Sequence, residues 1–303
     1  MSGESSIWIP IVLCAAAAQT VRNAAQRSLT QAAGTLPATL VRFLYGLPFA
    51  ALGFLAAHAI AGMELPDVSF PFLAWIALGA IAQLVATAFL LAAMAQRSFI
   101  VAVAYSKTEL LQIVLYSIAL LGETLSWATV AAIVLATAGV LLLSIQGATD
   151  RSDAGSWWSP AVFLGLACGA SFALSAVGYR GAALVLRGYP AWLVGLYSLV
   201  WAQALQTILL GVWLSARDRP GLRKVVAAWR VSVVAGLMGA LASGGWLTAF
   251  ALRNAADVRT VGLVEVFYGY VVSRRLFKER VTPRELAGIV LVAAGIGVIG
   301  FTR

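Results

Sequence analysis

Two stretches of the chain resemble each other, Glu109-Leu-Leu-Gln-Ile-Val-Leu-Tyr-Ser-Ile-Ala-Leu-Leu-Gly-Glu123 and Glu265-Val-Phe-Tyr-Gly-Tyr-Val-Val-Ser-Arg-Arg-Leu-Phe-Lys-Glu279. Each begins and ends with a glutamate, and the second lies 156 residues after the first. The same offset relates further pairs: Ser117 to Ser273, Leu120 to Leu276, Gly139 to Gly295, and Ile133-Val-Leu135 to Ile289-Val-Leu291. The chain is therefore predicted to contain two copies of one unit.

A weaker repeat lies upstream, where an offset of 153 residues relates Arg27 to Arg180 and Pro37 to Pro190. The two copies are predicted to span residues 1–147 and 156–303. They are expected to interlock as one structural body, because each alone would leave polar faces in lipid. Duplicated helical units of this kind are typical of transporters with a pseudo-two-fold axis.

Composition indicates an integral membrane protein. Hydrophobic residues make up 61% of the chain and charged residues 11%, whereas soluble domains carry about 25% charged residues. The net charge of +9 comes from basic residues that cluster between apolar runs, as topology signals do. The charge is therefore not interpreted as a nucleic-acid footprint, and the expected partner of the chain is a lipid bilayer. Cys14 and Cys168 lie in apolar runs and predict no disulfide framework.

Ten segments approach the roughly 20 apolar residues that a helix needs to cross a bilayer. They are Ile7–Leu29, Pro37–Ile60, Phe70–Ala95, Ser98–Leu121, Trp127–Ile145, Pro160–Leu184, Pro190–Ser215, Val231–Leu252, Thr260–Phe277 and Glu285–Phe301. Five helices per copy is an odd number, so the second copy must cross in the opposite sense. The predicted fold is all-α, with ten transmembrane helices arranged as two inverted five-helix repeats.

The Lys/Arg bias predicts the orientation of these segments. The basic linker Arg217–Lys224 and the segment Arg274–Arg280 fall on the side with more cations, which places them in the cytoplasm and both termini outside. The first apolar run has no basic leader and no clear cleavage site, so we expect a retained helix. The expected location is a cell membrane, as a multi-pass protein of the bacterial inner-membrane type. A monomer and a homodimer both fit.

Glu109 is the first candidate for a functional residue. A carboxylate at the centre of a membrane helix costs about 2.5–3.5 kcal/mol and usually faces a bundle interior or a watery cavity. Helical spacing places Tyr105, Gln112 and Tyr116 on the same stripe as Glu109, whereas Lys107 projects toward another helix. The alternative is a structural hydrogen bond or ion pair between helices.

Glu265 is the predicted counterpart of Glu109, with Tyr268 on the same helix face and Gly269 leaving room beside it. Burial raises the pKa of a carboxyl group and a nearby cation lowers it. A glutamate in a half-wet cavity is therefore expected to exchange a proton near neutral pH, so protons are a candidate partner. A fixed contact between helices is again the alternative.

The first predicted helix carries a polar stripe of Gln19, Arg22, Asn23 and Gln26, spaced i, i+3, i+4 and i+7. On an Ala-rich helix this stripe is expected to face inward and bind substrate, unless Arg22 snorkels into the interface. Gln83 and Trp246 are further candidates for lining the cavity.

Catalytic, metal and cofactor sites are not predicted. His58 is the single histidine of the chain, and one histidine without acidic or cysteine partners does not hold a metal. The sequence contains no Gly-rich phosphate loop and no G-x-S-x-G motif.

Taken in order, several short motifs carry a resemblance to a known family. They are Ala93-Met-Ala-Gln-Arg-Ser-Phe99, Lys107-Thr-Glu-Leu-Leu111, Gly122-Glu-Thr-Leu-Ser126 and Ala138-Gly-Val140 in the first half, and Ala251-Leu-Arg-Asn-Ala255, Glu265-Val-Phe267, Lys278-Glu-Arg-Val-Thr-Pro283 and Ala294-Gly-Ile296 in the second. With Arg27 and Arg42-Phe43, they make the chain resemble the EamA-like ten-helix branch of the drug/metabolite transporter superfamily.

This resemblance implies a secondary carrier that moves small metabolites, often amino acids or related solutes and frequently outward, through a cavity between helices. It implies no cofactor. Two alternatives stay open: a flippase for a lipid-linked or lysolipid substrate, and, less favoured, an intramembrane enzyme.

Overall fold

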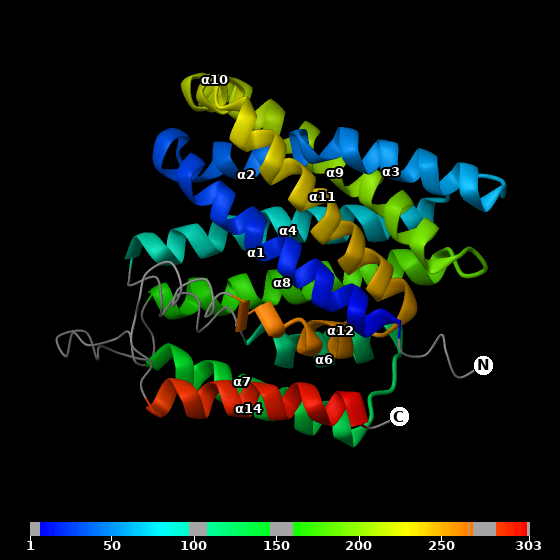
Figure 1. The fold of residues 1–303 in the computed structure, drawn as a ribbon, viewed down its shortest axis with the longest axis vertical. Coiled ribbons are helices and arrows are strands. Elements are labelled where there is room, and N and C mark those ends of the chain that lie inside the picture. Colours follow the sequence, from blue (N-terminus) through cyan, green and yellow to red (C-terminus); the bar gives the residue numbers. More distant parts are fainter. Residues whose placement is uncertain (1–6, 97–107, 146–159, 266, 269–282, 302–303) are drawn as a thin grey trace. The chain divides into compact units, whose positions relative to one another are not determined.

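The computed structural model of the chain describes residues 7–96, 108–145, 160–265, 267–268 and 283–301. Within this part every regular element is a helix, and the sole extended pairing is an isolated bridge between Arg187 and Tyr189. The all-α prediction is confirmed there (Figure 1).

The helices follow the predicted apolar segments closely. Their bounds are α1 Trp8–Ala33, α2 Thr35–Leu44, α3 Gly46–Ala61, α4 Phe70–Gln96, α6 Glu109–Leu121, α7 Trp127–Ile145, α8 Pro160–Val185, α9 Ala191–Arg217, α10 Arg219–Ala227, α11 Trp229–Leu252, α12 Ala255–Val261 and α14 Pro283–Phe301.

Five helical segments in the described residues are long and apolar enough to cross a membrane: Thr35–Ala61, Phe70–Phe89, Phe163–Val185, Ala191–Arg217 and Trp229–Leu252. Two shorter apolar helices, Glu109–Leu121 and Trp127–Gly139, accompany them. This composition is that of a membrane protein. The number of ten spans and their inverted arrangement stay predictions.

The predicted span Pro37–Ile60 lies within the apolar stretch Thr35–Ala61, which is long enough to cross a membrane and consists of two successive helices. α2 ends at Leu44 and α3 begins at Gly46, with Tyr45 between them. The cause is Pro48, which has no backbone N–H to donate to the carbonyl of Leu44 four residues earlier. The interruption is slight, because the Tyr45 backbone keeps helical angles (φ −81°, ψ −19°).

The basic linker after α9 differs from its prediction, because it folds into a helix of its own, α10. Asp218 caps this helix by accepting a hydrogen bond from the backbone N–H of Gly221 at 2.9 Å, and Pro220 occupies the first turn. An aspartate at the N-cap with a proline in the first helical turn is a strong start signal for a helix.

The predicted helix Thr260–Phe277 starts in the wrong place. Helical structure begins at Ala255, where Asn254 is the N-cap, and α12 ends at Val261. A turn at Gly262 and Leu263 follows before helical structure resumes at residues 264–265 and 267–268. In the first half, the predicted Ser98–Leu121 is described only from Thr108 onward.

The chain divides into two compact units, each of which combines segments from both predicted repeats. Unit 1 consists of residues 1–81 and 178–253. In it α1 packs along α11, and α9 packs against α2, α3 and α11. Small residues allow these close approaches: a methyl group added at Gly236 of α11 would lie 2.6 Å from the Cβ of Tyr45, and one at Gly245 would lie 2.8 Å from that of Ala15.

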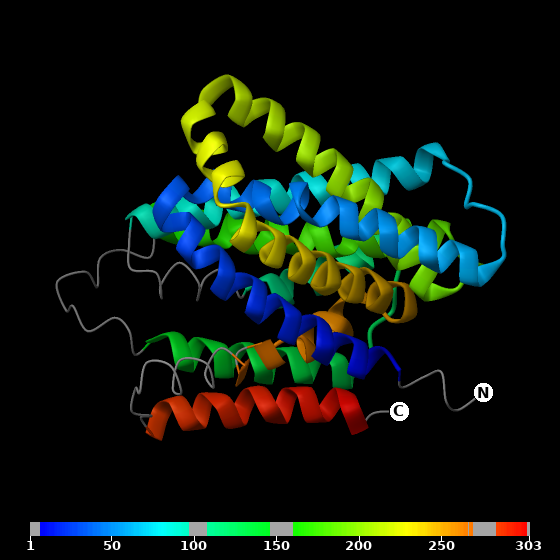
Figure 2. The same ribbon diagram turned by 45° about the horizontal axis from the view of Figure 1, so that its top comes forward.

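Unit 2 consists of residues 82–177 and 254–303. Its main contact joins α7 and α14, which lie side by side in Figures 1 and 2. A methyl group added at Gly139 of α7 would lie 2.7 Å from the carbonyl oxygen of Gly288. One added at Gly295 of α14 would lie 2.7 Å from the carbonyl oxygen of Ala132. Backbones this close leave no room for a side chain, so both glycines are required by the packing.

We predict that Gly139→Ala destabilises the protein by about 1–3 kcal/mol, because the added methyl overpacks the α7–α14 contact. Gly297→Ala on α14 is the control, since nothing lies within 4 Å of its added methyl. Thermal unfolding in detergent should show a lowered Tm for the first variant and an unchanged or slightly raised Tm for the second. A Gly139→Ala variant as stable as the Gly297→Ala variant would contradict this packing.

Candidate functional site

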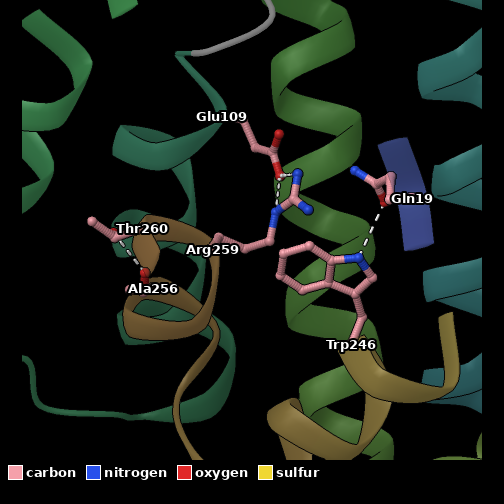
Figure 3. Close-up of polar contacts among 6 residues, drawn as sticks. All are labelled: Gln19, Glu109, Trp246, Ala256, Arg259 and Thr260. Carbon is pink, nitrogen blue, oxygen red and sulfur yellow. Dashed lines mark hydrogen bonds and ion pairs between the residues drawn. The ribbon is translucent and has the colours of Figure 1, made fainter. Parts of the chain in front are cut away.

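The predicted residue Glu109 is the first residue of α6 and is buried, with 4% of its surface exposed. Its Oε1 accepts hydrogen bonds from Nε of Arg259 at 2.8 Å and from Nη2 at 2.7 Å (Figure 3). α6 and α12, which carry the two residues, pack together in unit 2. A buried carboxylate is stable only when it is paired and hydrogen-bonded, and its place in the first turn of a helix adds a favourable dipole.

Glu265, the predicted counterpart, is half-buried and lies just beyond the turn at Gly262 and Leu263. Its backbone N–H donates to the carbonyl oxygen of Gly262 at 3.0 Å. Arg259 interacts electrostatically with Glu265 as well as with Glu109. The two glutamates predicted from the repeat therefore share one arginine. Tyr268 follows Glu265 and is half-buried.

The position of Arg259 depends on Asp257, a buried residue of the same short helix. Asp257 accepts hydrogen bonds from the Thr129 hydroxyl of α7 and from the Asn254 amide, each at 3.0 Å. Its backbone N–H donates to Oδ1 of Asn254 at 2.8 Å, so the two residues form a reciprocal cap. These bonds fix α12, and with it Arg259, against α7.

The other candidates of unit 2 contribute less. Gln112 donates from Nε2 to the Thr108 hydroxyl at 3.2 Å, and its Oε1 is buried with no hydrogen-bond partner in the structure as described. Gln83 is half-buried on α4, where its backbone carbonyl oxygen accepts a hydrogen bond from the Thr87 hydroxyl at 2.9 Å. Tyr105 and Lys107 lie outside the described residues.

In unit 1 the predicted stripe on α1 makes contacts with α11 and α2. Oε1 of Gln19 accepts from the indole N–H of Trp246 at 3.1 Å (Figure 3), and Trp246 is 6% exposed. Gln26 donates to the carbonyl oxygen of Ala38 at 2.7 Å. Arg22 is buried and donates from Nη2 to Oδ1 of Asn23 at 2.8 Å. Of the predicted stripe, Arg22 is buried, Gln19 and Gln26 are half-buried, and Asn23 is exposed. A substrate-binding role for the stripe stays a prediction.

Arg42 of α2 joins this stripe, and the sequence analysis did not select it as a candidate. Gly239 of α11 lies between the two arginines: its added methyl would be 3.4 Å from Cδ of Arg22 and 3.4 Å from Cβ of Arg42. The guanidinium of Arg42 lies 4.5 Å from the ring centre of Phe43. Two cations of unit 1 are thus gathered around one glycine.

Arg259 and Asp257 were also missed, although the sequence holds a signal for both. Asn254-Ala-Ala-Asp257 has the spacing of a reciprocal helix cap, which predicts a short helix that would carry Arg259 into the apolar run. In the part of the chain that the structure describes, no group of three His, Cys, Asp or Glu side chains is placed to hold a metal.

Comparison with known proteins gives the fold alone. One protein of known crystal structure aligns with 100% of this chain and 99% of its own length, with a TM-score of 0.70 and 19% sequence identity. No protein-family model matches the chain, and no curated protein matches it.

We predict that Glu109 and Arg259 are energetically coupled. Glu109→Gln and Arg259→Gln should each destabilise the protein by about 3–5 kcal/mol, because each leaves a buried charge without its partner. The double variant should lose less than the sum of the two, as measured by unfolding in detergent. The exposed residues Glu64 and Arg187 provide matched Gln controls, which should change little. Strictly additive effects would mean that the pair does not form.

Proposed function

We propose that this protein is a secondary transporter that moves a small metabolite, an amino acid or a related amphipathic solute, across a cell membrane by alternating access, with export as its direction. The observation that carries the proposal is the buried Glu109–Arg259 pair with Glu265 beside it, in a chain whose helices are apolar and long enough to span a bilayer. Ionisable residues at such depth mark transport paths more often than they serve packing.

The proposed architecture is ten spans in two inverted repeats, and the reciprocal packing of α7 and α14 supports it. Gly139 approaches Gly288, and Gly295 approaches Ala132. Gly295 follows Gly139 by 156 residues, and Gly288 follows Ala132 by the same 156 residues. The contact is therefore self-complementary, as it is across a two-fold axis.

Membership of the drug/metabolite transporter superfamily, in its EamA-like branch, is part of the same proposal. It rests on the ordered sequence motifs of the two halves and agrees with the helical fold. Carriers built from inverted repeats place their substrate near the bilayer midplane, and protons are a candidate coupling ion here because of the two glutamates.

The charges of unit 1 favour a substrate that carries a carboxylate. Arg22 and Arg42 flank Gly239, and no acidic residue occurs in the sequences of α1, α2 or α11. Guanidinium groups bind carboxylates with paired N–H donors. Trp246, seven residues after Gly239 on α11 and bonded to Gln19, offers an apolar ring with one polar atom, which suits an amphipathic solute.

A flippase for a lysolipid or lipid-linked substrate is the second candidate, because its substrate would also be amphipathic.

The test is a thermal-shift screen of the purified protein, since a ligand that binds the native state raises Tm by mass action. Amino acids should stabilise it, and their decarboxylated amines should not. Stabilisation by lysolipids alone would favour the flippase, and product formed in detergent would favour an intramembrane enzyme.

We predict that Glu109→Gln or Glu265→Gln impairs transport even in the molecules that fold, because glutamine keeps the volume of glutamate and removes its titratable charge. In proteoliposomes, uptake driven by an imposed pH gradient should fall at least about tenfold per folded molecule, as for other buried polar groups on a transport path. Glu64→Gln, in the exposed loop before α4, should transport normally. Normal, gradient-insensitive transport by both variants would remove the two glutamates from the mechanism.

We further predict that Trp246→Phe weakens ligand binding about fivefold to tenfold while Trp213→Phe does not. Phenylalanine keeps the aromatic ring and removes the N–H that fixes Gln19, a hydrogen bond worth about 1 kcal/mol. Trp213 is the control because it is 47% exposed on α9. Titration of Tm against ligand concentration measures both, and equal affinities would exclude a role for the Gln19–Trp246 contact.

A further inference from the structure

The short helix α10 presents a strongly basic surface that the proposed transport path does not use. Its cations, together with those directly before and after it, are here called the α10 basic face: Arg217, Arg219, Arg223, Lys224 and Arg230. All five are exposed. The one acidic residue among them, Asp218, is engaged as the N-cap of α10.

The opposite side of α10 is anchored in unit 1. Val225 is fully buried in a cluster with Leu29 and Val41. Gly221 is buried next to Pro37, where an added methyl would lie 2.7 Å from the proline ring. Because Gly221 and Val225 are four residues apart, they share one helix face. Helical spacing places Arg219 and Arg223 on the opposite face of α10.

The neighbours of α10 in the chain fix its place relative to a bilayer. α10 joins the end of α9 to the start of α11 (Figure 2), and both of those helices are long and apolar enough to span. With 9 residues, α10 is only about 14 Å long, which is far short of the hydrocarbon thickness. It must therefore lie at a membrane surface.

Two exposed apolar side chains adjoin the basic face. Val226 is 53% exposed and Trp229 is 55% exposed, and the guanidinium of Arg230 lies 5.6 Å from the Trp229 ring centre. Tryptophan is enriched at the level of lipid headgroups. Cations beside apolar residues on a surface helix are the pattern of helices that bind anionic membranes.

We propose that the α10 basic face binds the phosphate groups of anionic phospholipid headgroups. Clustered Lys and Arg next to a membrane helix attract anionic lipids, and the attraction adds with each cation. Lipid accounts for the exposed Val226 and Trp229, which a nucleic acid or an acidic soluble protein would leave uncovered. This proposal depends on the membrane location of the chain and not on which solute it transports.

The test is thermal unfolding of the full-length protein in non-ionic detergent with added phosphatidylglycerol or phosphatidylcholine. Phosphatidylglycerol should raise Tm by several degrees more than phosphatidylcholine, and about 0.5 M salt should remove most of the difference, because salt screens exposed charges. In the variant Arg223→Gln/Lys224→Gln/Arg230→Gln, the apparent affinity for phosphatidylglycerol should fall about tenfold or more. Arg219 is kept because its Nε donates to the carbonyl oxygen of Ser215 at the end of α9.

Two control variants keep the test decisive. Arg187→Gln/Arg253→Gln removes exposed cations elsewhere in unit 1 and should leave the lipid response unchanged. Arg223→Lys/Arg230→Lys keeps the charge and should retain the response, even if the triple variant proves too unstable to assay. Equal Tm in the two lipids, or a full response in the triple variant, would overturn the proposal. Two further outcomes would overturn the assignment to a membrane surface. In one, glycerol phosphate alone raises Tm as much as the lipid does; in the other, an RNA oligonucleotide raises it more.

Discussion

The burial of a glutamate among apolar helices is the constraint on which the rest of unit 2 depends. Glu109 is 4% exposed, and an unpaired carboxylate at that depth would be protonated or would destabilise the fold by several kcal/mol. Arg259 supplies the opposite charge at 2.7 Å. Its helix, α12, has only 7 residues, too few for a stable helix by itself, so something else must fix it.

The fixing groups form a chain of dependent contacts. Asn254 caps α12, and Asp257 ties it to Thr129 on α7. The position of α7 is set in turn by its close packing on α14, where Gly139 and Gly295 remove the side chains that would separate the two backbones. A change far from the ion pair, such as a methyl group at Gly139, can therefore reach the charge site through α7 and α12.

In unit 1, two half-buried polar side chains are also paired, but their partners are uncharged backbone carbonyl oxygens, some of them at a helix end. Gln26 donates to the Ala38 carbonyl, and Arg180 donates to the carbonyl oxygens of Phe250 at 2.6 Å and Ala251 at 3.3 Å. Those two carbonyls lie at the C-terminal end of α11, where no further turn is present to bond them. A cation there satisfies them and opposes the negative end of the helix dipole. Polar side chains on these helices thus complete the bonding of neighbouring backbones.

Apolar runs and start signals made most helices predictable, since bilayer-length hydrophobic segments have few alternatives to a helix. α7 begins and ends at the residues expected for it, Trp127 and Ile145. The differences from the prediction occur where a capping side chain decides where a helix starts: Asp218 starts α10 in a predicted linker, and Asn254 starts α12 before the predicted Thr260. Glu109 could be selected because a carboxylate in an apolar run is conspicuous. Its partner could not, because the pairing of residues 150 positions apart is set by tertiary packing.

The proposed repeat is symmetric in its scaffold and asymmetric in its charges. Glu109 and Glu265 are related by 156 residues, but the position that corresponds to Arg259 is Val103, so the repeat supplies one arginine for two glutamates. Arg259 donates hydrogen bonds to Glu109 and interacts with Glu265 electrostatically. Within the described residues, Arg259 is shared by both carboxylates. A group that neutralises one of them, a proton or an ammonium, leaves more of the attraction of Arg259 to the other. A difference of this kind between two states is what a ligand needs in order to shift their populations. In the proposed transporter, the two halves of the scaffold are related by symmetry but their charges are not. The unequal charges therefore stabilise one access state when the site is loaded and the other when it is empty.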